Sequence, residues 1–136
     1  MNSLGKLEDI TVVIAEDDGD IRFALTEFLC RQGAKVFSCS NAEEALEAVR
    51  VNRPDIVLSD IGLPKRDGFQ LLEDIRSLNA DQGRHVPVIA MTAYDWSGER
   101  ARRLSGTFEA HLDKPFKPDQ LLSAVASTLD HRVAPE

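Results

Sequence analysis

The stretch Ile56-Val57-Leu58-Ser59-Asp60 decides how the rest of the chain is interpreted. Its apolar residues run directly into an aspartate, and turn-forming residues follow at 61–68. A short apolar run bounded by turn residues is typical of a strand that is buried on both faces of a parallel sheet. Asp60 then lies at the carboxyl end of that strand, where ligands collect in open α/β sheets. The stretch therefore predicts a reactive carboxylate at Asp60.

The length and composition of the chain indicate a single intracellular domain. Its 136 residues are enough to bury a core, and no long linker divides them. The formal net charge of −7 argues against nucleic acid as the main partner, because phosphate contacts need a basic surface. No apolar run approaches the roughly 18 residues that cross a bilayer, and the start lacks the apolar core of a signal peptide. We therefore expect a cytoplasmic protein without membrane segments.

Strand and helix patterns alternate along the chain. Besides 56–60, short runs of strand-forming residues predict strands at 11–15, 35–39, 88–91 and 108–112. Apolar residues at helical spacing predict helices at 20–32, 41–51, 67–78, 96–104 and 118–129. This alternation favours a doubly wound (βα)5 fold, in which helices cover both faces of a parallel five-stranded sheet. The expected strand order is the flavodoxin-like 2-1-3-4-5.

Capping residues set the boundaries of these elements. Gly33 is expected to end the first helix, and Pro118 suits the first turn of the last one. Asn41 with Glu44 three residues later is typical of a capping box, and Asp67 is the expected cap of the third helix. The second strand is more polar and is expected at a sheet edge. The elements predict a domain over 11–130, with a leader at 1–10 and a tail at 131–136.

In this predicted layout, four loops at the carboxyl edge of the sheet bring charged and hydroxyl side chains together. They carry Glu16-Asp17-Asp18, Asp60, Thr92 and Lys114. Carboxylates from neighbouring strands, with a backbone carbonyl, form an oxygen-only site that suits Mg²⁺ or Mn²⁺. A bound cation would offset the repulsion between Asp17 and Asp60 and leave Asp60 ionised as a nucleophile. Thr92 and Lys114 would then bind a phosphoryl group on Asp60.

The motifs at this edge resemble those of response-regulator receiver domains, the phosphoacceptors of two-component signalling. The resemblance covers residues 11–129 and is carried by VVIAEDD (12–18), LSDIGLP (58–64) with DG (67–68), MTA (91–93) and DKPF (113–116). It implies that a histidine kinase or a histidine phosphotransfer protein phosphorylates Asp60. It implies Mg²⁺ held by Asp17, Asp60 and the backbone carbonyl of Gly62, with Glu16 acting through water. It also implies a signalling protein that catalyses only its own phosphorylation and slow dephosphorylation, rather than an enzyme.

Two departures from the family pattern bear on function. Glu16 stands where the family often has an aspartate, and His111 occupies the switch position that is usually Tyr or Phe. A coupled change of Thr92 and His111 would run through an imidazole, which titrates near neutral pH; the alternative is a packed histidine. The change would reach a downstream protein at the face formed by the fourth helix (96–104), the fifth strand and the fifth helix. The sequence around Asp60 and His111 also resembles receivers of hybrid histidine kinases, which favours a phosphorelay.

Other functions fit parts of the pattern. A phosphohydrolase of the haloacid-dehalogenase type also forms an aspartyl phosphate, but it has a second aspartate where this chain has Gly62. A flavin-binding module needs a phosphate loop at 16–18, where acidic residues would repel phosphate. A scaffold receiver that has lost phosphorylation would not need Asp60 together with Thr92 and Lys114. Taken singly, each of these side chains is more often a cap, a backbone-bonded hydroxyl or a surface charge.

Overall fold

The computed structural model describes residues 6–93 and 108–132 of the chain. In chain order the elements are β1 (Thr11–Ala15), α1 (Gly19–Arg31), β2 (Lys35–Cys39), α2 (Ala42–Asn52), β3 (Ile56–Asp60), α3 (Gly68–Arg76), the short 3₁₀ helix η1 (Ala80–Gln82), β4 (Val88–Thr92), β5 (Ala110–Asp113) and α5 (Pro118–Arg132). The helix predicted at 96–104 lies outside the described residues. None of the helices described is long and apolar enough to cross a membrane.

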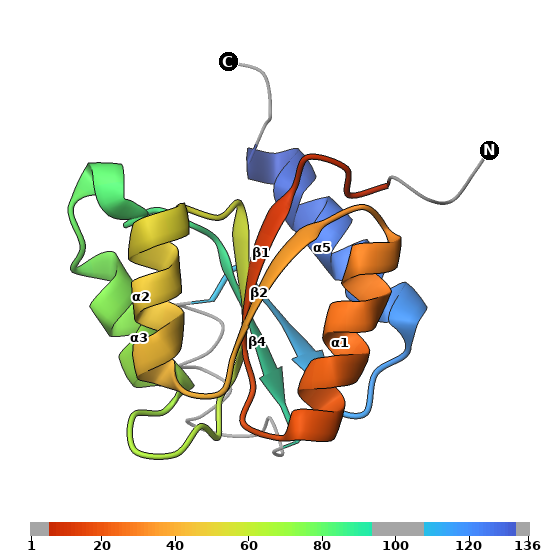
Figure 1. The fold of residues 1–136 in the computed structure, drawn as a ribbon, viewed down its shortest axis with the longest axis horizontal. Coiled ribbons are helices and arrows are strands. Elements are labelled where there is room, and N and C mark those ends of the chain that lie inside the picture. Colours follow the sequence, from red (N-terminus) through yellow and green to blue (C-terminus); the bar gives the residue numbers. More distant parts are fainter. Residues whose placement is uncertain (1–5, 94–107, 133–136) are drawn as a thin grey trace.

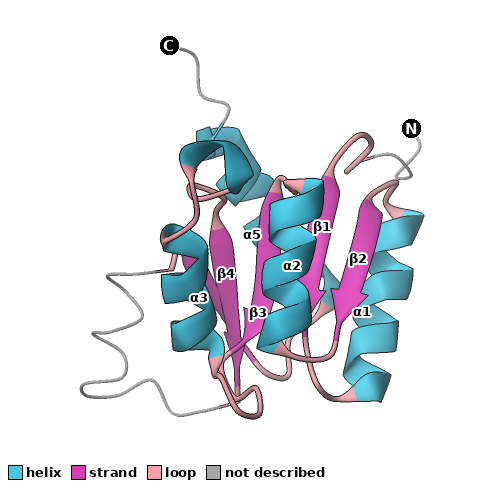
Figure 2. Cartoon of the chain, turned by 60° about the vertical axis from the view of Figure 1, so that its left-hand side comes forward, coloured by secondary structure: helices cyan, strands magenta, loops and turns pink. Residues whose placement is uncertain are grey.

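All five strands run parallel, in the order β2-β1-β3-β4-β5. α1 and α5 cover one face of the sheet and α2 and α3 cover the other, so the sheet is the middle of three layers (Figure 1; Figure 2). The more polar β2 lies at an edge, as its sequence predicts. The flavodoxin-like arrangement is therefore confirmed. Because the strands are parallel, their carboxyl ends all lie at one edge of the sheet, at the bottom of Figure 1.

Alternating strand residues build two separate cores. Val13 and Val57 pack toward α2 and α3, whereas Ile14 and Leu58 pack toward α1 and α5. β3 is buried along its whole length, as the continuous apolar run predicts. Asp60 is its last residue, so the most enclosed part of the sheet delivers a carboxylate to the edge.

Side-chain caps begin three of the helices. Asp18 caps α1, and Asn41 and Asp67 cap α2 and α3 as predicted. The capping box predicted for Asn41 and Glu44 is half correct. The Asn41 side-chain oxygen accepts the Glu44 N–H at 2.8 Å, but the Glu44 carboxylate accepts the N–H of Ser40, at 2.9 Å, instead of that of Asn41. The helix therefore starts where predicted, with its reciprocal bond displaced by one residue.

The fifth strand differs from its prediction. It was expected at 108–112, but pairing with β4 begins at Ala110 and the strand runs to Asp113. Phe108 is nevertheless buried, and its ring packs edge-on against Phe69 of α3 with 5.6 Å between the ring centroids. The apolar character of Phe108 therefore reflects packing before the strand rather than a place within it. The third helix likewise ends at Arg76, two residues short of its predicted end.

Candidate functional site

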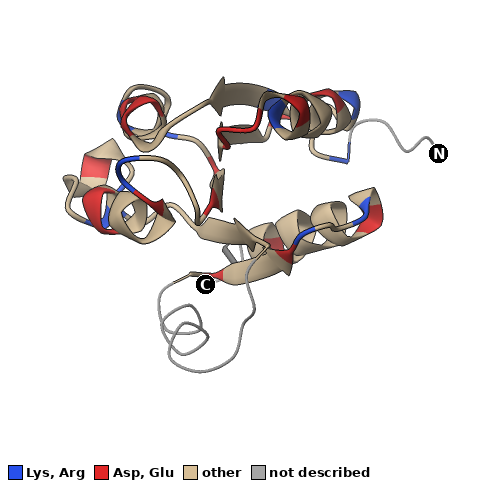
Figure 3. Cartoon of the chain, turned by 90° about the horizontal axis from the view of Figure 1, so that it is seen from below, with Lys and Arg blue, Asp and Glu red and all other residues tan. Residues whose placement is uncertain are grey.

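The carboxyl edge of the sheet brings together the side chains that the sequence predicts to act. β1 leads into Glu16 and Asp17, β3 ends at Asp60, β4 ends at Thr92 and β5 leads into Lys114. The strand register aligns them, because Asp60 pairs with the residue before Thr92 and the Lys114 N–H donates to the Thr92 carbonyl at 2.7 Å. Viewed from below, acidic residues lie at these strand ends (Figure 3).

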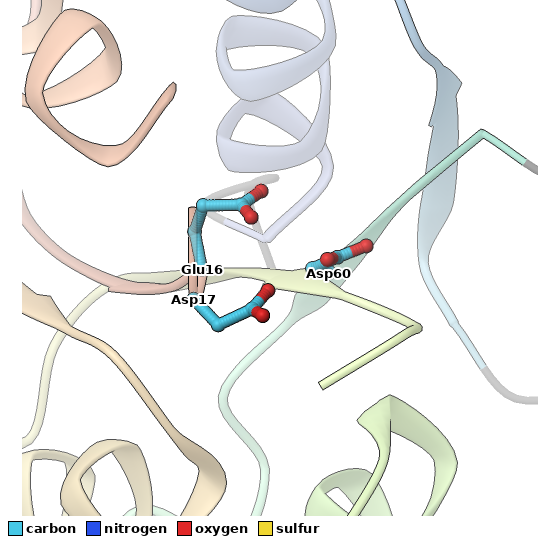
Figure 4. Close-up of side chains that lie close together, drawn as sticks. All are labelled: Glu16, Asp17 and Asp60. Atoms are coloured by element: carbon cyan, nitrogen blue, oxygen red, sulfur yellow. The ribbon is translucent and has the colours of Figure 1, made fainter. Parts of the chain in front are cut away.

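Three carboxylates form the centre of this edge (Figure 4). One oxygen from each of Glu16, Asp17 and Asp60 lies within 4.8 Å of the other two. Glu16 is fully buried and Asp60 is 7% exposed, whereas Asp17 is open to solvent. Oxygen donors at this spacing, with one side open to water, fit a hard divalent cation such as Mg²⁺, which retains several of its waters. The donor set contains no soft ligand that would favour another class of metal.

Lys114 lies against two of these carboxylates. Its Nζ is 2.7 Å from a Glu16 oxygen and 3.5 Å from an Asp60 oxygen. Burial, the largest single influence, lowers the pKa of Lys114, but the hydrogen bond to Glu16 and the charges of Asp60 and Glu16 together raise it above its usual value. Lys114 therefore stays positively charged beside the strand end of β3.

Glu16 is held by protein donors on both of its oxygens. One accepts the Lys114 ammonium, and the other accepts the N–H of Asp18 at 3.1 Å. Burial raises the pKa of Glu16 and the charge of Asp60 raises it further, although the bonds from Lys114 and Asp18 act in the opposite direction. Glu16 thus orients Lys114 in addition to lining the carboxylate cluster.

Asp60 is supported by contacts with its own strand end and with α3. The Ser59 hydroxyl donates to the Asp60 carbonyl at 3.0 Å, and the Gly62 N–H donates to the Asp60 carboxylate at 3.3 Å. A Cβ atom on Gly68, the first residue of α3, would lie 2.6 Å from the Asp60 carbonyl oxygen. Gly68 is therefore needed for α3 to approach this strand so closely. The sequence places Gly68 in a turn motif but does not reveal this approach, which depends on tertiary packing.

Thr92 and His111 lie on the same face of the sheet. Thr92 is 1% exposed. Its side chain lies on the same side of β4 as that of Ala90, which belongs to the core under α2 and α3. His111 pairs with Ala90 in the parallel register, so its side chain leaves the sheet on that side too. Unlike Thr92, His111 is exposed. A switch role for His111 stays a prediction.

Residues 12–126 match the family model of the response regulator receiver domain. The chain belongs to this family. The receiver is 31% identical over 119 residues to the polar-differentiation response regulator DivK of Brucella anthropi, with 88% of this chain and 95% of DivK covered. It is 34% identical over 119 residues to an uncharacterized 14.6 kDa protein of Leptolyngbya boryana, with 88% and 89% covered. It is 30% identical over 127 residues to response regulator MprA of a Mycobacterium species, covering 93% of this receiver but only 53% of MprA.

Solved receiver structures share the architecture. The receiver domain of sensor histidine kinase PA1611 from Pseudomonas aeruginosa, solved with a magnesium ion in its active site cleft, is 28% identical with a TM-score of 0.79. That comparison covers 88% of this receiver and 97% of the other chain. The chemotaxis protein CheY4 of Vibrio cholerae is 25% identical with a TM-score of 0.80, covering 88% and 98%. This chain therefore shares the receiver fold with these proteins.

No sequence pattern identifies one further residue beside the carboxylate cluster. Arg22 of α1 donates from Nη1 to the backbone carbonyl of Glu16 at 2.9 Å. Helical periodicity places Arg22 in the first helix, but no sequence pattern shows that its side chain turns back to residue 16. The predicted output surface stays a prediction, because its fourth helix (96–104) lies outside the described residues.

Proposed function

We propose that the receiver accepts a phosphoryl group on Asp60 from a phosphohistidine of a histidine kinase or a histidine phosphotransfer protein. The observation that carries the proposal is the setting of Asp60, a nearly buried carboxylate between two further carboxylates and a charged lysine. A merely structural strand-end aspartate needs no such arrangement, and holding three acidic groups so close together is costly without a cation. Membership of the receiver family supports the same role.

In this proposal Asp17 and Asp60 hold Mg²⁺ or Mn²⁺ directly, with the Gly62 carbonyl as a further ligand and Glu16 acting through water. The magnesium ion in the PA1611 receiver supports the choice of metal. When bound, the cation would neutralise the charge of the carboxylates and of the incoming phosphoryl oxygens. The exposed position of Asp17 leaves that side of the site open to solvent and to a donor.

The chemical step is a transfer between two nucleophiles. An Asp60 carboxylate oxygen attacks phosphorus, the P–N bond to the donor imidazole breaks, and the imidazole leaves with its electron pair and takes a proton from solvent water. Lys114 and the Thr92 hydroxyl then bind phosphoryl oxygens of the aspartyl phosphate. For this, Lys114 must exchange part of its contact with Glu16 for the phosphoryl group, which lies within reach because Nζ is already 3.5 Å from Asp60.

The proposed output is a change in protein binding or onward transfer of the phosphoryl group. Thr92 and His111 lie on one face of the sheet. A shift of Thr92 toward the phosphoryl group would therefore change the packing beside His111 on β5. The target surface is the face of the predicted helix 96–104, β5 and α5. We place the protein in the cytoplasm, without nucleic acid or membrane as a partner, and expect no catalysis beyond its own phosphorylation and slow dephosphorylation.

Phosphorylation by a small donor tests the proposal. Wild-type protein incubated with acetyl phosphate and Mg²⁺ should gain one phosphoryl group by intact mass, and omission of Mg²⁺ should abolish the gain. Asp60→Asn keeps the shape of the side chain but removes the nucleophile, so it should fold normally and remain unlabelled. Labelling of Asp60→Asn at the wild-type rate would show that the site is elsewhere. An unlabelled wild-type protein would favour the scaffold function.

A further inference from the structure

The peptide group that joins Glu16 to Asp17 is fixed from outside the strand by Arg22. Nη1 of Arg22 donates to the Glu16 carbonyl oxygen at 2.9 Å. Arg22 stands in the first turn of α1, where its own N–H bonds the Asp18 carbonyl at 2.9 Å and Asp18 caps the helix. The guanidinium therefore projects from a rigid base and is not a loosely held surface group.

The other polar atoms of Glu16 are already occupied. Its N–H donates to the Cys39 carbonyl of β2 at 3.0 Å, and its carboxylate oxygens accept from Lys114 and from the Asp18 N–H. The contact from Arg22 therefore completes the set of bonds that fixes residue 16. This residue is held in one orientation by β2, α1 and the loop after β5 together.

That orientation matters for the neighbouring carboxylate. The carbonyl of Glu16 and the N–H of Asp17 belong to one planar peptide group, so rotating that plane redirects the chain at Asp17. Asp17 is the exposed member of the carboxylate cluster, and its carboxylate approaches Asp60 from this loop (Figure 4). Fixing the peptide plane thus fixes the separation between the two carboxylates proposed to hold the cation.

We infer that Arg22 is a positioning residue of the cation site, acting through the Glu16–Asp17 peptide. This inference rests on the proposed function, because it assumes a cation between Asp17 and Asp60. The sign of the effect separates positioning from charge. A guanidinium near a cation site repels the cation, so removal of its charge alone would tighten Mg²⁺ binding. Removal of a positioning group weakens it instead.

Magnesium titration of three variants provides the test. Arg22→Met removes the donor but keeps most of the stem, and it should weaken Mg²⁺ binding by about 10-fold or more, the usual effect of losing an outer-sphere partner. Arg22→Lys keeps the charge without the planar fork and should give an intermediate loss. Arg31→Met is the matched control on the same helix, since the Arg31 side chain is 74% exposed and pairs with Glu27, so Mg²⁺ affinity should not change.

The readouts are the Mg²⁺ dissociation constant by calorimetry and the rise in melting temperature with added Mg²⁺. Phosphorylation by acetyl phosphate should be slowed at low Mg²⁺ and restored at saturating Mg²⁺. Wild-type affinity, or tighter binding, in Arg22→Met would overturn the inference alone, and if that variant does not fold, wild-type affinity in Arg22→Lys would do so. Failure of the wild-type protein to bind Mg²⁺ would instead overturn the proposed cation site, and the inference with it.

Discussion

The two edges of the sheet are built from different kinds of interaction. At the amino edge, backbone hydrogen bonds join the start of one strand to the loop before a neighbouring strand, and the Asp55 carboxylate accepts the Thr11 N–H at 2.8 Å. At the carboxyl edge, polar side chains are themselves buried. Four of the five buried polar residues in the described part of the chain lie there, namely Glu16, Ser59, Asp60 and Thr92.

This difference shows where the molecule accepts an electrostatic cost. A buried charge is unfavourable unless a partner compensates it, and at the carboxyl edge Lys114 is that partner. We therefore expect substitutions at the carboxyl edge to lower stability by leaving a buried charge without a partner. A second substitution that neutralises that charge should restore stability. It should not restore phosphorylation. At the amino edge, stability alone should change.

The largest effects are expected for Lys114→Met, which keeps the apolar stem and removes the ammonium. Phosphorylation by acetyl phosphate should fall by about 100-fold or more, as for loss of other groups that stabilise developing charge. The free energy of unfolding should fall by about 3 kcal/mol, because the Glu16 carboxylate is left buried without the positive charge of the Lys114 ammonium. Urea unfolding and intact-mass kinetics measure the two effects separately.

The double variant Lys114→Met/Glu16→Gln separates the two effects. A neutral glutamine side chain at position 16 still accepts the N–H of Asp18 but no longer needs a counter-charge, so most of the lost stability should return. Phosphorylation should stay slow, because the double variant still has no lysine ammonium to bind the phosphoryl oxygens. Recovery of both properties in the double variant would mean that Lys114 serves only to neutralise Glu16.

A smaller effect is expected for Gly68→Ala. The added Cβ would meet the Asp60 carbonyl oxygen at 2.6 Å, so β3 and α3 must separate at the acceptor. We expect a loss of about 1–3 kcal/mol in unfolding free energy and slower phosphorylation. Gly19→Ala is the matched control, since Gly19 also begins a helix but its Cβ would meet only Arg22, at an ordinary 3.8 Å. Equal effects of the two substitutions would contradict the close approach at Asp60.

The sequence predicts the fold and the membership of the site because both depend on local patterns. Apolar runs ending in polar residues locate the strands, and parallel strands necessarily bring Asp17, Asp60, Thr92 and Lys114 to one edge. Phe108 shows where such patterns fail, because burial against Phe69 of a distant helix looks the same in sequence as burial within a strand.

Contacts between distant segments are not encoded in any local pattern. The bond of Lys114 to Glu16 spans 98 residues, and at 2.7 Å it is shorter than the 3.5 Å between Lys114 Nζ and Asp60. No local pattern around either residue indicates which carboxylate the lysine contacts more closely. The reach of Arg22 back to residue 16 depends on a rotamer, and the tight fit of Gly68 depends on helix packing. These contacts surround side chains that the sequence already predicts to lie at one edge of the sheet.

The smallest effect is expected at the amino edge. Asp55→Ala removes the acceptor for the Thr11 N–H, which should lower the unfolding free energy by about 1 kcal/mol. Asp55→Asn keeps an acceptor oxygen in place, so its unfolding free energy should stay close to that of the wild type. Phosphorylation and Mg²⁺ affinity should match the wild type, because this contact lies at the opposite end of β1 and β3 from Asp60. If Asp55→Ala slowed phosphorylation at a temperature where the variant is fully folded, the two edges would be coupled through the central strands. The division between a stabilising edge and a reactive edge would then have to be abandoned.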